Sequence, residues 1–385
     1  MFRRLYVGWW AALLACGTSA LGNARGSEGR ILFPVPFQVV QREGFVPERA
    51  HEHQPGGPAL GHGRLPITAE WSEPLPSRFE YRVVPRGEGA RNDWTALEVA
   101  RSGRTITSTA NILAGGWYRL EVRGLEGTRV TASLAVEPVG VGEVFVIAGQ
   151  SYAAGTNDSL LRVEDTEGRV VAHDLAAKTW RVAHDPQPAV GDGGTIWPAF
   201  GDSLRPMVRV PIGLVNVAVA GTSSRQWLPG TPLYQNLEAA GKAIGRFRAV
   251  LWQQGESDVI EKVATDVYVA NLQTIRAGLV RAWGFEPPWL LAKSTLHPTV
   301  YNDSVHEGLI RSAIDRLWGT PGFRPGPDTD ILGGENRGGP KSRRHFSEVG
   351  QRRAALLWFT AVWAELLSEP GRRHEPDGPR RQSDP

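Results

Sequence analysis

Four short apolar runs after residue 140 are each followed by side chains that could do chemistry. The runs cover residues 144–148, 213–219, 249–252 and 289–292. Ser151 follows the first run after Gly149, and the third run leads into Gln254 and Glu256. If these runs are parallel strands, the hydroxyl, amide and carboxylate groups that follow them lie at one edge of a sheet, where ligands bind in open α/β folds.

A serine directly after a buried strand is a candidate nucleophile, because a tight turn exposes its hydroxyl. Ser151 has this position, although serine at a strand end more often caps a helix. An acyl-transfer site also needs a general base and donors for an oxyanion. His345 is the best-placed base among the nine histidines, since it lies just before the last predicted helix and after all the predicted strands. The alternative for His345 is an ordinary surface histidine.

The elements that must position these residues follow from the apolar pattern. Large apolar side chains recur at helical spacing after Thr265, which we expect to cap the helix. They are Tyr268, Leu272, Ile275, Leu279 and Trp283. A last helix is predicted after Ser347. Strands that alternate with helices require right-handed crossovers. The pattern therefore predicts an α/β domain over residues 141–368, with helices on both faces of a parallel sheet.

A different pattern precedes this domain, in residues 31–139. Short alternating runs occur at 37–40, 79–84, 117–122 and 131–136, separated by Gly, Pro, Asn and Asp. This spacing predicts an antiparallel β-sandwich. We expect three neighbouring histidines, His51, His53 and His62, to be solvated loop residues rather than metal ligands, because only Glu52 is a carboxylate nearby.

The two ends of the chain have compositions typical of non-globular segments. Residues 1–24 begin with Arg3 and Arg4, continue with an apolar stretch and end in small residues, as secretory signal peptides do. Export to the periplasm, the cell surface or the medium is therefore expected. Leu-Leu-Ala before Cys16 resembles a bacterial lipobox, which would give a lipid anchor to a bacterial membrane; cleavage at a later small residue is the alternative. Residues 369–385 predict a disordered tail.

Length and charge exclude several classes of protein. The 385 residues have room for two or three domains, and 43 Lys and Arg balance 40 Asp and Glu to a net charge of +3. This charge is too small to indicate a nucleic-acid partner. Cys16 is the single cysteine, which excludes an internal disulfide and a multi-cysteine metal site.

The polar segments resemble the sequence blocks of a known family. In chain order, residues 144–151, 220–223, 251–258 and 345–350 resemble the blocks of the sialate O-acetylesterase-like branch of the SGNH hydrolases, which includes acetylxylan esterases. The resemblance implies a three-layer SGNH-hydrolase fold, beside which an Ig-like domain also occurs in similar proteins. It implies a serine esterase that releases acetyl groups from an acetylated glycan through an acyl-enzyme, without a metal or organic cofactor.

By position, the resemblance makes Ser151 the nucleophile and His345 its general base. The backbone N–H groups of Ser151 and Gly221, together with the Gln254 side chain, would form the oxyanion hole. Three residues depart from the family's usual pattern, in which Asn, His and Asp occupy these positions: Tyr152, Gln253 and Ser342.

The third departure removes the carboxylate expected to orient His345. Glu256 is the expected substitute, with a purely structural role at the sheet edge as the alternative. Further candidate acids are Asp258, Asp328 and Asp330. Three tryptophans are candidates for stacking on a sugar: Trp197, Trp227 and Trp252.

Two other functions stay open at this stage. If Tyr152 crowds the pocket and His345 lacks its acid, the protein is a catalytically impaired glycan-binding module of the same fold. Alternatively, it is an esterase for another acyl ester, such as a lipid or a peptidoglycan acetyl group. The sequence leaves open the oligomeric state and the role of the β region.

Overall fold

The computed structural model describes residues 29–47, 57–338 and 344–367. Several features discussed above lie outside the described residues: the predicted signal peptide with Cys16, the histidines at 51 and 53, Ser342, and the predicted tail at 369–385. No helix in the described part of the chain is long and apolar enough to cross a membrane.

The first part of the chain is mainly β, as the alternating runs predict. One antiparallel sheet has the order β1-β3-β7-β6, formed by β1 (Gly29–Phe33), β3 (His62–Trp71), β7 (Thr105–Leu113) and β6 (Ala100–Ser102). In β3, every second residue is buried, including Leu65 and Ile67, so one face of this sheet packs into the core. A second set of strands consists of β2 (Gln38–Gln41), β4 (Arg78–Arg86), β5 (Thr95–Ala96) and β8 (Trp117–Glu126).

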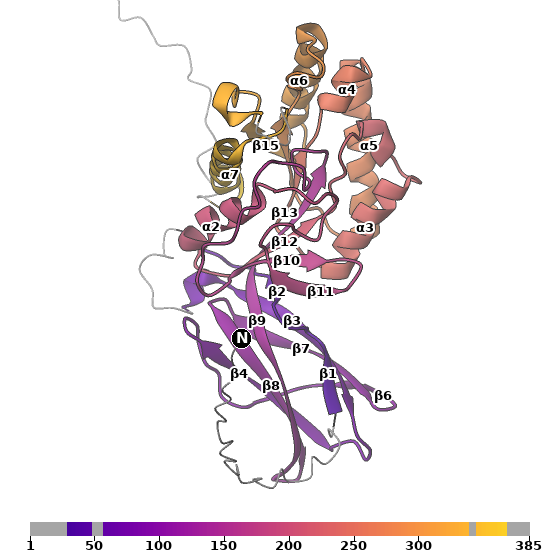
Figure 1. Ribbon diagram of the computed structural model, residues 1–385. Coiled ribbons are helices and arrows are strands. Elements are labelled where there is room, and N and C mark those ends of the chain that lie inside the picture. The colour runs from indigo at the N-terminus through magenta and orange to yellow at the C-terminus, as the bar shows by residue number, and fades with distance from the viewer. Residues whose placement is uncertain (1–28, 48–56, 339–343, 368–385) are drawn as a thin grey trace, which may run out of the picture.

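A single long strand connects this β region to the rest of the molecule. β9 (Arg129–Gly149) has 21 residues; its first part pairs antiparallel with β8, and its last part pairs with parallel strands. The second set of strands and the parallel strands thus form one eleven-stranded sheet (Figure 1). The predicted Ig-like sandwich is not confirmed as a domain of its own, and the predicted boundary at 139–141 falls inside β9.

The α/β part has the large central sheet that the sequence predicts. Its strands follow the order β11-β10-β12-β9-β13-β14-β15, and neighbours are parallel except for the β10–β11 hairpin. The additional strands are β10 (Val170–Asp174), β11 (Thr179–Val182), β12 (Ile212–Asn216), β13 (Ala249–Gln253), β14 (Trp289–Lys293) and β15 (Phe323–Asp328).

Helices cover both faces of these parallel strands (Figure 1). On one face lie α2 (Trp197–Val208) and α7 (Glu348–Val362), which contact each other; on the other lie α3 (Pro232–Ile244), α4 (Glu256–Ile260), α5 (Thr265–Trp283) and α6 (Ser304–Trp318). Successive residues of β9 explain the two layers. Phe145 and Ile147 pack into one hydrophobic cluster, whereas Val144 and Val146 pack into the other.

Two helix starts were predicted from the sequence. The last helix, α7, begins after Ser347 as predicted, and the Ser347 hydroxyl caps it by accepting a hydrogen bond from Gly350 N at 3.3 Å. The predicted Thr265 cap is wrong: Ala264 is the N-cap of α5, and the Thr265 hydroxyl donates to Leu309 O at 3.0 Å instead. A contact with α6, which the local sequence does not show, takes the hydroxyl away from its own helix.

Candidate active site

The carboxyl ends of neighbouring strands bring the predicted site segments together. β9 and β13 pair with Gly149 opposite Gln253, and Gln150 N donates to Gln253 O at 2.9 Å. Gly149 has φ +128°, and a Cβ at this position would lie 2.1 Å from Gln253 O. Only glycine therefore allows the tight turn that leads to Ser151.

Ser151 is placed as a strand-end residue that is largely buried, with 5% of its surface exposed. The Thr156 hydroxyl donates to Ser151 O at 2.5 Å and closes the turn. The backbone N–H groups of Ser151 and Gly221 donate to no other group in the described part of the chain. Both N–H groups are therefore free to donate to an oxyanion.

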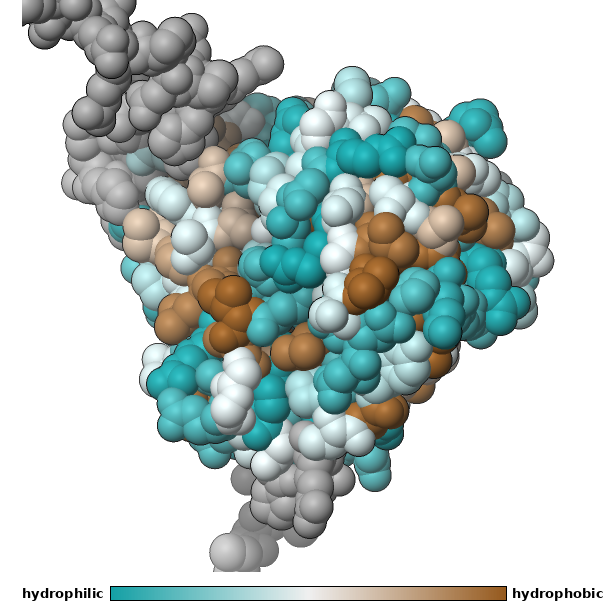
Figure 2. Space-filling view, turned by 90° about the horizontal axis from the view of Figure 1, so that it is seen from above, coloured by the Kyte–Doolittle hydropathy of each residue, from teal (hydrophilic) through white to brown (hydrophobic). Residues whose placement is uncertain are grey.

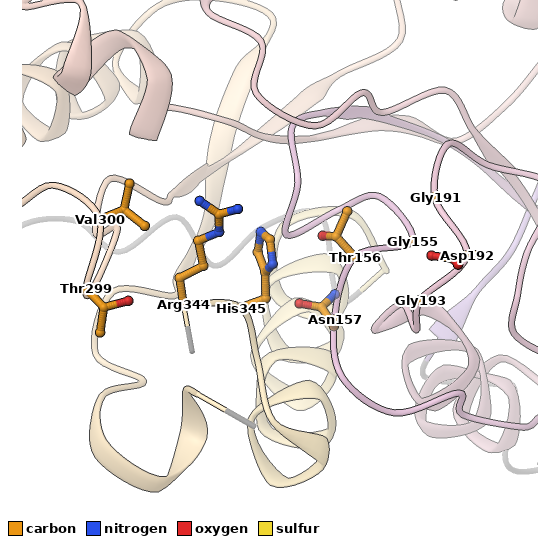
Figure 3. A pocket seen from close by; sticks show the side chains of 10 residues that line it. All are labelled: Gly155, Thr156, Asn157, Gly191, Asp192, Gly193, Thr299, Val300, Arg344 and His345. Atoms are coloured by element: carbon orange, nitrogen blue, oxygen red, sulfur yellow. The ribbon is translucent and has the colours of Figure 1, made fainter. Parts of the chain in front are cut away.

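A cavity of about 690 Å³ opens beside His345 (Figure 3). It is lined by Gly155, Thr156, Asn157, Gly191, Asp192, Gly193, Thr299, Val300, Arg344 and His345. In Figure 3, the imidazole lies between the Arg344 side chain and the loop that carries Thr156 and Asn157. The surface viewed from above this end of the molecule mixes hydrophilic and hydrophobic patches (Figure 2).

One wall of the cavity consists of closely packed backbone. Gly155 N donates to Val190 O at 3.0 Å, and Gly193 N donates to Gly155 O at 2.8 Å. Gly191 has φ +103°, and a Cβ there would lie 2.2 Å from Gly155 O. The local sequence signal for this wall is its run of glycines, but sequence reasoning did not identify it as part of the site.

His345 is poised as a neutral base. Its side chain is mostly buried, and this burial, with the nearby charges of Arg344, His297 and Arg337, lowers the pKa of His345 to about 4. The imidazole is therefore uncharged at pH 7 and can accept a proton. The Ser151 hydroxyl has no hydrogen-bond partner among the described residues. The bond from a nucleophile to its general base often tightens only when substrate binds.

Glu256, the expected substitute for the missing acid, makes its described side-chain hydrogen bond with Ser294. Glu256 is fully buried and accepts a hydrogen bond from the Ser294 hydroxyl at 2.6 Å; its other oxygen has no partner among the described residues. Burial raises the pKa of Glu256 to about 8, so the carboxyl is mainly protonated at neutral pH. A neutral acid held by Ser294 fits the structural alternative better than the orienting role.

The three further candidate acids also have other partners. Asp258 accepts from Ser224 N at 2.8 Å and from the Ser224 hydroxyl at 2.5 Å. Asp328 and Asp330 both pair with Arg311, at 2.5 and 2.8 Å. None of these carboxylates hydrogen-bonds His345, and Ser342 lies outside the described residues.

The amide of Gln254 is engaged within the protein. Its nitrogen donates to Gln150 Oε1 at 3.2 Å and Thr222 O at 3.1 Å, and also to a carboxylate oxygen of Asp258. An oxyanion would have to compete with these acceptors for the amide hydrogens. The oxyanion role of Gln254 stays a prediction.

The aromatic candidates are not among the residues that line the cavity. Tyr152 is fully buried and does not line the cavity, so it does not crowd the pocket. The prediction that Trp197, Trp227 and Trp252 stack on a sugar is wrong, because all three are fully buried. A sheet with helices on both faces encloses the aromatic residues of its strands and helices in the core.

Metal-binding side chains do not cluster in the described structure. No group of three or more His, Cys, Asp or Glu residues there could hold a metal ion. Apart from Val300, the side chains that line the cavity carry hydroxyl, amide, imidazole, carboxylate and guanidinium groups. These are the groups of an acyl-transfer or carbohydrate-binding site.

Comparison with known proteins adds the decisive observation. Residues 141–288 match the family described as carbohydrate esterase, sialic acid-specific acetylesterase. The resemblance to this family of carbohydrate esterases is confirmed. The matched residues contain three of the four sequence blocks, whereas His345 lies beyond them.

Two known proteins illustrate the extent of the similarity. A protein of Arabidopsis thaliana named "probable carbohydrate esterase" is 28% identical over 163 residues, which cover 36% of this chain. The chain spans 63% of that relative's length. The crystal structure of a carbohydrate acetylesterase from Xanthomonas citri is 18% identical, with a TM-score of 0.55 over 87% of this chain and 74% of that one. The second similarity shows that the mixed α/β fold is shared.

Proposed function

We propose that this protein is an exported serine esterase that hydrolyses acetyl esters of carbohydrates. The observation that carries the proposal is the polar cavity at the carboxyl ends of the strands. There the loop that follows Ser151 meets the neutral His345, in a chain whose α/β segment matches the carbohydrate esterases. The lining supports a sugar ligand, because Thr156, Asp192 and Thr299 can exchange hydrogen bonds with hydroxyl groups.

The reaction would proceed in two steps. Ser151 Oγ attacks the acetyl carbonyl carbon while His345 accepts the hydroxyl proton. The carbonyl oxygen becomes an oxyanion that the N–H groups of Ser151 and Gly221 stabilise. The bond to the sugar oxygen then breaks, and His345 returns the proton to that oxygen, which leaves an acetyl-enzyme. In the second step, His345 deprotonates a water molecule that attacks the acetyl group, and acetate and free Ser151 are released.

The test measures acetate release from acetylated xylan and hydrolysis of p-nitrophenyl acetate. We expect Ser151→Ala to lower kcat by about 10³-fold or more. Ser203→Ala is the matched control, because the Ser203 hydroxyl only donates to Ala199 O within α2. Equal rates for the unchanged protein and Ser151→Ala would contradict the proposal.

A glycan-binding module is the second candidate, favoured by one observation: the cavity lining offers Thr156, Asp192 and Thr299, which can bind sugar hydroxyl groups without any reaction. Calorimetric titration with deacetylated and acetylated xylan distinguishes the two functions. Binding without any Ser151-dependent hydrolysis of a panel of acetylated glycans, lipids and peptidoglycan fragments would favour the binding module. Hydrolysis confined to a lipid or peptidoglycan ester would change the substrate class and keep the mechanism.

Export rests on the N-terminal sequence, and mass spectrometry of the mature protein from a bacterial host tests it. A mature chain that begins with a diacylated Cys16 would support the lipid anchor. A start at a later small residue would support free secretion. A chain that retains Arg3 and Arg4 would contradict export.

A further inference from the structure

The side chain of Tyr152 connects the turn that carries Ser151 to the segment that carries His345. Its hydroxyl lies 2.8 Å from Arg344 O, the carbonyl directly before His345, and 3.1 Å from Leu296 O. Its ring meets the His345 imidazole edge to face, with 5.3 Å between the ring centroids and 82° between the ring planes. The residue next to the proposed nucleophile thus contacts both the backbone and the ring of the proposed base.

The Tyr152 ring is itself held firmly. The Arg337 guanidinium lies 4.4 Å from the ring centroid, and the Phe346 ring lies 4.9 Å away, centroid to centroid. Arg337 is fixed in turn, because it donates to Leu332 O at 2.7 Å and to Thr329 O at 3.0 Å. Burial raises the pKa of the Tyr152 hydroxyl, which therefore stays protonated as a donor.

A second set of hydrogen bonds holds Phe346, the residue directly after His345. Asn157 Oδ1 accepts a hydrogen bond from Phe346 N at 3.1 Å, and Asn157 Nδ2 donates to Tyr152 O at 3.2 Å. Asp158 N donates to Phe346 O at 3.1 Å. The residues directly before and after His345 are therefore both fastened to the loop that follows β9.

We propose that Tyr152 is a positioning residue for His345 and fixes the orientation of the imidazole relative to Ser151. The inference rests on the proposed function, in which His345 is the general base. A general base must be held within about 0.5 Å and 10–20° of its productive geometry by packing and hydrogen bonds. Tyr152 supplies both kinds of contact, and it adjoins the residue whose proton the base receives.

The experiment compares two substitutions that each delete one buried hydroxyl, Tyr152→Phe and Tyr81→Phe. Tyr81 is the matched control, since its hydroxyl also donates to a backbone carbonyl, Asn111 O at 3.1 Å, but in the β region. We expect Tyr152→Phe to lower kcat by about tenfold, as a misaligned general base would, while KM changes by less than about twofold. Tyr81→Phe should leave both constants unchanged.

Imidazole resonances in a ¹⁵N–¹H NMR spectrum separate positioning from a merely structural role. The His345 resonance is assigned by its loss in His345→Ala. We expect Tyr152→Phe to shift this resonance, while the resonances of His62 and His306 stay in place. A Tyr152→Phe protein whose His345 resonance and kcat match those of Tyr81→Phe would overturn the proposal, as would a lower melting temperature with an unshifted His345 resonance.

The unchanged protein offers a measurement that needs no variant. The edge-to-face contact requires a nuclear Overhauser effect between the Tyr152 and His345 ring protons, and its absence would overturn the inference. This measurement is independent of turnover. If the protein shows no Ser151-dependent hydrolysis, the proposed function fails, while the spectra still decide whether Tyr152 orients His345.

Discussion

Two polar segments meet at the same edge of the sheet and differ in what their polar atoms do. The segment after β13 is the more polar in sequence, with Gln254, Glu256 and Asp258 within five residues, and each of these side chains is completely buried. The loop after β9 contributes Thr156 and Asn157 to the cavity, which it shares with Arg344 and His345.

The difference shows that polarity in sequence does not by itself locate a reactive surface. A buried polar group is costly without a partner, so buried polar side chains that lie close together form hydrogen bonds with one another and with the backbone. The segment after β13 is such a network, in which Gln254 and Asp258 bond to each other and to neighbouring loops. The loop after β9 leaves groups open toward a ligand. Four experiments test this division.

The largest effect is expected at the cavity. His345→Ala removes the proposed base, and we expect kcat to fall by about 10⁴-fold because a triad without one member retains little catalysis beyond its oxyanion hole. The measurement is kcat for acetate release. His62→Ala, which removes an exposed histidine on β3, is the control and should retain full activity. Similar rates for both variants would place the chemistry elsewhere.

The next effect is expected on stability, in the segment after β13. Asp258→Asn replaces a carboxylate oxygen with an amide nitrogen, which cannot accept hydrogen bonds from the donors Ser224 N and Gln254. We therefore expect a loss of about 1–3 kcal/mol in the free energy of unfolding. Urea denaturation measures this loss. Asp266→Asn changes an aspartate whose side chain is 85% exposed, and it should alter the free energy by less than about 0.5 kcal/mol. If Asp258→Asn and the unchanged protein unfold at the same urea concentration, the network contributes no stability.

A smaller effect concerns the pH dependence of hydrolysis. A base works when neutral, so kcat/KM falls as pH drops through the pKa of His345. With that pKa lowered to about 4, activity should persist at pH 5.5, where a histidine with an ordinary pKa would lose about tenfold. Arg344→Gln removes one positive charge that lowers this pKa and should move the acid limb to higher pH. A profile with its acid limb at about pH 6.5 in the unchanged protein would contradict the buried base.

The smallest effect is expected from Glu256→Gln. The substitution replaces a mainly neutral carboxyl with a neutral amide whose oxygen can still accept from Ser294, so kcat/KM should change by less than about threefold. Initial rates with p-nitrophenyl acetate measure it, with Ser203→Ala as the reference. A loss approaching that of His345→Ala would instead make Glu256 the acid that orients His345, and the two segments would then act as one site.

Much of the α/β architecture was predictable from the sequence. The apolar runs at 144–148 and 249–252 lie within β9 and β13, and Ser347 caps α7. These features are local, because strand burial and helix capping depend on residues a few positions apart. The continuity of β9 was not predictable in this way. Its two halves have different burial patterns, so the sequence predicts two strands in separate domains.

The sequence by itself determined the order of strands and helices, the glycine turn before Ser151 and the resemblance to carbohydrate esterases. Only the tertiary structure decided which polar groups face the cavity. Tyr152 and Arg344 are 192 positions apart, yet a hydrogen bond joins them beside His345. Exposure, partners and pKa depend on segments that folding brings together from distant parts of the chain. The polar motif after β13 therefore became a buried network, and the less conspicuous loop after Ser151 became the wall of the site.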